Sequence, residues 1–84
     1  MLTENKLLLL ASQVIIWTAF TIVYTLIDYT SPGVHFGDDF NAPYFSTITQ
    51  LTIGFGDIAP KTTTARLLVS AHAVLSSFSA ILLL

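Results

Sequence analysis

Two Phe-Gly-Asp triplets mark the parts of this 84-residue chain whose residue types and spacing suggest chemistry. The downstream triplet ends the run TIGFGD, which extends from Thr52 to Asp57, and the upstream triplet lies in HFGDDF, beside the paired Asp38 and Asp39. Both runs combine oxygen ligands with glycine, which adopts left-handed backbone geometry without a steric penalty. The chain has no nucleophile triad, no metal-ligand cluster and no phosphate loop followed by Lys-Ser or Lys-Thr. We therefore expect neither an enzyme nor a bound cofactor.

The composition indicates a protein that lies in lipid. The chain is 54% hydrophobic and 10% charged, and its mean hydropathy is +0.77. This small number of charged residues could not cover the surface of a water-soluble protein. We therefore expect an integral membrane protein in contact with lipid. The net charge of −2 and the lack of a basic patch argue against a nucleic-acid partner.

The pattern of apolar segments predicts an all-α membrane protein with two transmembrane helices. Residues 7–29 and residues 63–84 are apolar, and at 1.5 Å per residue each reaches roughly 33 Å, enough to cross a bilayer. Between them, residues 30–42 form a polar loop, residues 43–51 form a helix too short to span, and residues 52–57 are broken by glycine.

A half-length helix followed by irregular backbone, between two spans, is typical of a re-entrant loop. Irregular backbone at membrane depth is tolerated only where protein buries it or water lines it. Two helices cannot surround such a loop alone, so we expect several copies to assemble.

The downstream run resembles the signature of potassium channels, T-x-x-T-x-G-[YF]-G-D. Residues 49–57 match it position by position, after a short helix and between two spans. The resemblance continues in Tyr44 and Phe45, an aromatic pair that opens the pore helix in this family, and in Pro60 and Arg66 before the inner helix. The run GFGDIAPKTT, followed by Ala71-His72, is most similar to the miniature potassium channels of viruses that infect algae. The resemblance implies a homotetrameric pore module with both termini in the cytoplasm.

In that family the signature forms the selectivity filter. Four chains supply carbonyl oxygens that replace the water shell of K⁺. Consecutive carbonyls can point inward only if ordinary and left-handed backbone geometry alternate, and glycine supplies the left-handed residues. We expect Ile53 and Phe55 to point away from the axis and to pack the strand against the pore helix. The filter is then Thr52, Ile53, Gly54, Phe55, Gly56 and Asp57, with K⁺ bound at the carbonyls of the first four and at the Thr52 hydroxyl, and with Tyr44, Phe45 and Thr49 as pore-helix support.

Phe55 departs from the commoner tyrosine, and Ile48 stands where some members of the family carry a carboxylate. Both differences remove polar bracing of the filter, and a contact between Tyr44 and Asp57 is a possible replacement. The upstream triplet has no threonine ladder and no adjacent helix, so we interpret it as a solvated turn, with a cation site at Asp38 and Asp39 as the alternative.

The second span carries small and polar residues along one face. At about 100° per residue this stripe suggests a water-lined cavity, although close helix packing through small residues explains it as well. His72 lies beside the stripe, and we expect it to be packed or hydrogen-bonded at a helix interface, with a titrating gate as the alternative. We expect the serines to bond the carbonyl four residues earlier. The candidates for the cavity or for a gate are Ala73, Ser76, Ser77, Ala80 and Leu84.

Two other functions remain open at this point. A weakly selective pore, such as a holin-like protein, would need amphipathic spans but no filter run. A non-conducting membrane subunit would give no ion flux.

Overall fold

The computed structural model describes residues 2–83, which contain three helices: α1 (Leu2–Thr30), α2 (Ala42–Gln50) and α3 (Thr63–Leu83). The fold is all-helical, as the sequence predicts, and two stretches are long and apolar enough to cross a membrane, Asn5–Thr30 and Thr63–Leu82. Helix α1 begins five residues before the span expected from residue 7, because the polar residues at its start continue the helix.

The short helix α2 is fixed by local signals at both ends. Asn41 caps its start, where the side-chain oxygen accepts a hydrogen bond from the backbone N–H of Tyr44, and Pro43 lies in the first turn. This is the position where proline costs a helix nothing, because the first N–H groups have no partner inside the helix. At the other end, the N–H of Leu51 bonds to the carbonyl of Thr47, and the chain then leaves the helix. The helix therefore spans Ala42–Gln50, one residue from each expected boundary.

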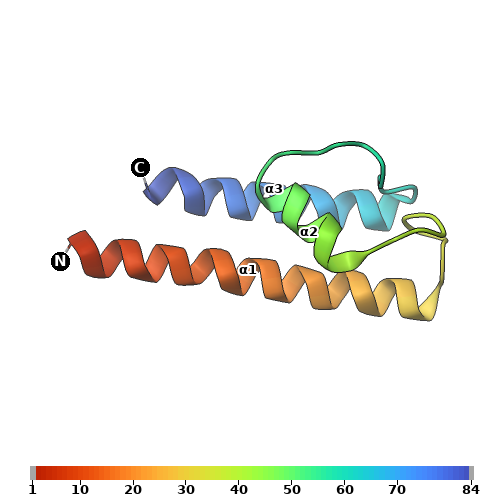
Figure 1. Ribbon diagram of the computed structural model, residues 1–84, viewed down its shortest axis with the longest axis horizontal. Coiled ribbons are helices and arrows are strands. Elements are labelled where there is room, and N and C mark those ends of the chain that lie inside the picture. The colour runs from red at the N-terminus through yellow and green to blue at the C-terminus, as the bar shows by residue number, and fades with distance from the viewer. Residues whose placement is uncertain (1, 84) are drawn as a thin grey trace.

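The two long helices lie side by side and run in opposite directions, and α2 lies against both (Figure 1). Both termini are at one end of the molecule, and the loop of residues 31–41 is at the other. The segment after α2 forms an arc that returns to the start of α3 at this second end. Between the two helices of membrane length, the chain therefore forms a loop, the short helix α2 and an irregular segment that follows α2.

An aromatic cluster joins the three helices near the loop end. Tyr24 is fully buried at its centre, and its ring lies 5.4 Å from that of Phe45 and 5.5 Å from that of Phe36, both edge-on. Such edge-to-face pairs add to the free energy gained from burying aromatic area. The cluster fixes α2 against α1, and Ala65 of α3 is buried in the same core.

The loop of residues 31–41 is more closely packed than the sequence analysis predicted. It does turn, with positive φ at Gly33 and Gly37. Phe36 of the upstream triplet, however, is only 3% exposed and stacks on Phe40 at 4.2 Å. The interpretation as an ordinary solvated turn is therefore wrong for Phe36, because its ring finds an apolar partner in the aromatic cluster. The triplet anchors the loop to the helices.

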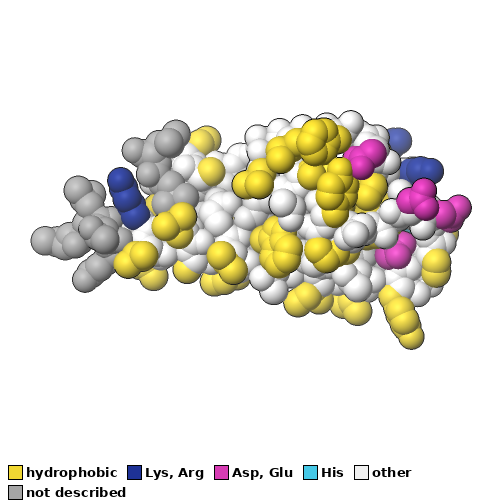
Figure 2. All heavy atoms as spheres, in the orientation of Figure 1, with side chains coloured by type: hydrophobic (Ala, Val, Ile, Leu, Met, Phe, Trp, Pro, Cys, Tyr) yellow, Lys and Arg dark blue, Asp and Glu magenta, His cyan; other side chains and the backbone are white. Residues whose placement is uncertain are grey.

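Hydrophobic side chains form patches along the length of the face shown in Figure 2. Charged side chains gather toward the ends of the long axis in this view. Along α1 and α3, large apolar side chains such as Ile15, Leu67 and Phe78 are exposed. A water-soluble monomer rarely exposes apolar surface on this scale, and lipid and further protein chains are the surroundings that would cover it.

Candidate functional site

The segment after α2, residues 52–57 (the glycine segment), alternates between two backbone geometries. Thr52, Gly54 and Gly56 have positive φ values of 59°, 56° and 82°, whereas Ile53 and Phe55 between them do not. This is the alternation expected from the glycine spacing. The left-handed geometry of Thr52 was not predicted, and it is uncommon for a residue with a branched β-carbon. At Gly54 and Gly56 an added β-carbon would meet no atom of the chain within 4 Å, so backbone geometry alone requires glycine there.

The N-terminal end of this segment is attached to the last turn of α2. The carbonyl of Ile48 accepts from the N–H of Ile53 at 2.8 Å and from that of Gly54 at 3.2 Å. The N–H of Thr52 bonds to the carbonyl of Thr49, and the Thr52 hydroxyl donates to the carbonyl of Leu51 at 2.6 Å. Carbonyl groups at the end of a helix have no partner inside it, and the segment uses them as acceptors.

The C-terminal end of the segment is attached to the first turn of α2. The hydroxyl of Tyr44 donates a hydrogen bond of 2.8 Å to the carboxylate of Asp57, so the contact suggested by the sequence is present. This hydrogen bond, together with desolvation and the nearby negative charge, raises the pKa of Tyr44 above its usual value. Tyr44 therefore stays neutral and remains a donor at physiological pH.

The side chains between these two attachments do not pack as predicted. Phe55 is 69% exposed and Ile53 is 48% exposed, so within one chain Phe55 does not pack the strand against α2. The face of α2 that packs into the core is occupied by its own side chains Phe45 and Ile48. Phe55 is therefore left largely uncovered by the described part of the chain.

The remaining predicted support residues lie on α2. Phe45 is buried in the aromatic cluster, where it fixes the helix. Thr49 faces a hollow between the glycine segment and α3, which Thr52, Gly54 and Ala73 also line. Thr49, predicted as pore-helix support, therefore lines the same hollow as Thr52, predicted for the filter, and Ala73, predicted for the cavity.

The five cavity or gate candidates of α3 do not share one environment. Ala73 and Ser77 are half-buried and Ala80 is exposed, whereas Ser76 is buried between α3 and α1. Ser76 and its neighbour Ser77 differ in burial because one residue rotates a helix by about 100°. Leu84 lies outside the described residues.

The expected serine back-bonding is only partly right. Ser70 does donate to the carbonyl of Arg66, four residues earlier. Ser76 instead donates to the carbonyl three residues earlier, and the hydroxyl of Ser79 lies 2.6 Å from that of Ser12 on α1.

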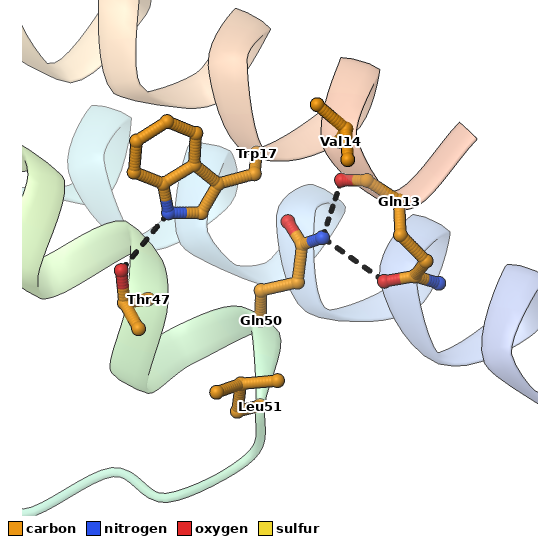
Figure 3. A pocket seen from close by; sticks show the side chains of 6 residues that line it. All are labelled: Gln13, Val14, Trp17, Thr47, Gln50 and Leu51. Carbon is orange, nitrogen blue, oxygen red and sulfur yellow. Dashed lines mark hydrogen bonds between the residues drawn. The ribbon is translucent and has the colours of Figure 1, made fainter. Parts of the chain in front are cut away.

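A set of polar contacts between α2 and α1 was not predicted from the sequence (Figure 3). The indole N–H of Trp17 donates to the hydroxyl of Thr47, and the side-chain amide of Gln50 donates to Gln13. The signal was available, since a glutamine in the middle of an apolar run is costly in lipid and indicates a specific partner. His72 is fully buried with hydrogen bonds at both ring nitrogens, in agreement with the expected helix-interface position.

The alternative site at the upstream triplet finds no support. Among the side chains described, those of residues 5–82, no group of three or more His, Asp or Glu is placed to hold a metal ion. Asp38 and Asp39 line a shallow hollow that Asp57 and Lys61 also line. These charges lie at the C-terminal end of the glycine segment.

Comparison with known proteins identifies the class. The family described as ion channel matches residues 11–84, which is most of the chain. The chain belongs to this ion-channel family, and it is a membrane protein.

One relative adds detail. The chain is similar to the potassium channel protein kcv of Paramecium bursaria Chlorella virus 1, with 58% identity over 31 residues. The match covers 37% of this chain and 33% of that protein, so it spans a third of the relative's length. No solved structure matches.

Proposed function

We propose that the chain is a potassium-selective channel that conducts K⁺ passively across a membrane. The observation that carries the proposal is the alternation of φ at Thr52, Gly54 and Gly56. A strand in which every second residue is left-handed is able to turn consecutive carbonyls toward one side. A ring of such carbonyls is what K⁺ needs in place of its water shell.

The conducting unit is a homotetramer. One chain supplies one strand, and a carbonyl cage requires four strands around an axis. The exposed glycine segment and the exposed ring of Phe55 support this assembly, because one chain leaves both uncovered. In the tetramer, Phe55 packs against an adjacent copy, and K⁺ binds at the carbonyls of Thr52, Ile53, Gly54 and Phe55.

The orientation follows from the filter. Both termini lie at the end of the molecule opposite the acidic hollow beside Asp57. We place the termini in the cytoplasm and this hollow outside, where its carboxylates attract cations to the pore entrance. Ala73, Ser77 and Ala80 then line the inner cavity.

The test is single-channel recording from purified protein in a planar bilayer, with K⁺ on one side and Na⁺ on the other. The proposal predicts unitary currents whose reversal potential approaches the equilibrium potential of K⁺. A reversal potential near zero would indicate a weakly selective pore, and a silent bilayer with protein verified in the membrane would indicate a non-conducting subunit. Either outcome would overturn the proposal.

A further inference from the structure

A closed set of hydrogen bonds joins all three helices at the end of α2. His72 of α3 contacts the hydroxyl of Tyr24 through Nδ1, at 2.9 Å, and the amide oxygen of Gln50 through Nε2, at 3.0 Å. The amide nitrogen of Gln50 contacts the backbone carbonyl of Gln13 at 2.5 Å and the side-chain oxygen of Gln13 at 2.9 Å. The amide nitrogen of Gln13 donates to the carbonyl of Ser76 at 2.9 Å, which returns the set to α3.

The direction of these bonds follows by elimination. The backbone carbonyl of Gln13 can only accept, so the atom of Gln50 that faces it is the amide nitrogen. The other atom of that amide is then an oxygen, which also can only accept. His72 therefore carries a proton on Nε2, and the neutral ring accepts from the Tyr24 hydroxyl at Nδ1. Each of these polar groups is satisfied in one arrangement only.

The position of Gln50 gives this arrangement a consequence for the filter. Gln50 is the last residue of α2, two residues before Thr52. The N–H groups of Ile53 and Gly54 both bond to the carbonyl of Ile48, so the strand is held by the last turn of α2. The side-chain amide of Gln50 connects that same turn to both α1 and α3, and Figure 3 shows its two bonds to α1.

We propose that Gln50 is a positioning residue for the filter, and that His72 acts on the filter through it. The Nε2–H of His72 and the carbonyl of Gln13 fix the amide of Gln50 from two sides. This fixes the height and rotation of the last turn of α2, and hence the place where the strand begins. The inference rests on the proposed function, because it concerns the filter of a potassium channel.

The experiment must distinguish this positioning role of His72 from a role in packing alone. Its ring stacks on Phe20, with centroids 4.4 Å apart, so any replacement also loses packing. Two replacements lose the ring equally but keep different hydrogen bonds. In His72→Gln the amide reaches the position of Nε2 and can still donate to Gln50. In His72→Asn the amide reaches only the position of Nδ1, so it keeps the Tyr24 contact and leaves Gln50 without a donor.

The experiment records single channels of wild type, His72→Gln, His72→Asn and Gln50→Leu in planar bilayers, under asymmetric K⁺ and Na⁺. We expect His72→Gln to stay within about twofold of wild type in mean open time and in the Na⁺-to-K⁺ permeability ratio. His72→Asn and Gln50→Leu should each change the open time by about tenfold and raise the permeability ratio, because every copy loses the part-buried hydrogen bond between His72 and Gln50 at the filter base. Thr18→Ala, which removes only an exposed hydroxyl bonded within α1, is the matched control and should behave as wild type.

The outcomes separate the two claims. Equal behaviour of the Gln and Asn variants, or wild-type behaviour of Gln50→Leu, would overturn the positioning role while leaving the channel intact. If the histidine variants do not assemble, as judged by gel filtration, Gln50→Leu decides alone. A wild-type protein that does not select K⁺ would instead defeat the proposed function.

Discussion

The hydroxyl of Tyr44 lies 2.8 Å from the carboxylate of Asp57, and this pair closes the glycine segment onto the first turn of α2. The other end is attached to the last turn of α2, where the carbonyl of Ile48 accepts hydrogen bonds from the N–H groups of Ile53 and Gly54. The segment is thus attached to one helix at two points, and its middle is free of attachment to the side chains of that helix. We therefore expect that a substitution at one attachment point leaves the other attachment in place.

Tyr44→Phe should shorten the open periods of the channel and leave unitary conductance nearly unchanged. The substitution removes the outer attachment but keeps the ring, and the inner attachment at Ile48 remains. Single-channel dwell times would measure the effect. Open periods equal to those of wild type would show that the 2.8 Å contact does not hold the filter.

The same pair predicts how the channel responds to alkaline pH. The pKa of Tyr44 is raised by its hydrogen bond to Asp57, so the neutral donor persists at and above the usual tyrosine value of about 10. The stabilisation is present in full below the unfolded-state pKa and is lost as the pH rises through the higher folded-state pKa. The difference in open time between wild type and Tyr44→Phe should therefore be constant from about pH 7 to pH 9. A difference that disappears within that range would contradict the assignment.

Gly56→Ala should abolish K⁺ current without preventing membrane insertion. The β-carbon meets no atom within 4 Å in the chain, so the cost is that of left-handed geometry, about 1–2 kcal/mol in each copy. Ile53→Val, at a position with ordinary backbone geometry, is the control and should still conduct. Robust selective current from Gly56→Ala would remove the observation that carries the proposed function.

Ser46→Ala should leave stability unchanged or raise it by up to about 1 kcal/mol. Ser46 is fully buried in α2, and its hydroxyl has no hydrogen-bond partner among the described residues. The neighbouring Thr47→Ala should instead lower stability by about 1 kcal/mol, since Trp17 loses its acceptor. Unfolding in detergent by heat or denaturant would measure both. A loss on Ser46→Ala as large as that on Thr47→Ala would indicate a partner for Ser46 in the assembled protein.

Phe36→Ala should destabilise the protein by about 3 kcal/mol, because its ring is buried in the aromatic cluster. Val34→Ala, in the same loop but exposed, is the control and should change stability little. Thermal unfolding of the two variants would compare them. If both cost the same small amount, the upstream triplet would be the solvated turn that its sequence suggests.

The sequence predicted what depends on local chemistry. Apolar runs of membrane length indicated both spans, Asn41 and Pro43 indicated the start of α2, and the spacing of Gly54 and Gly56 indicated the alternating backbone. These features depend on single residues or on a short pattern, so they can be predicted from the order of residues in the chain.

The contacts that escaped prediction depend on three helices at once. Gln50, Gln13 and His72 are far apart in the chain, and only packing decides which polar group meets which. Ser76 and Ser77 differ by one step of the helix, yet one faces α1 and the other does not. Phe55 escaped for a different reason, because the surface that would cover it belongs to another copy in our account.

The most direct test of the account is the position of permeant ions in the assembled protein. A crystal structure of the protein in lipid or detergent, with Rb⁺ or Tl⁺ replacing K⁺, would locate the ions by their anomalous signal. The account predicts a fourfold assembly with ions in a row on its axis, at the levels of the carbonyls of Thr52, Ile53, Gly54 and Phe55. An assembly without fourfold symmetry, or ions bound away from these carbonyls, would contradict it.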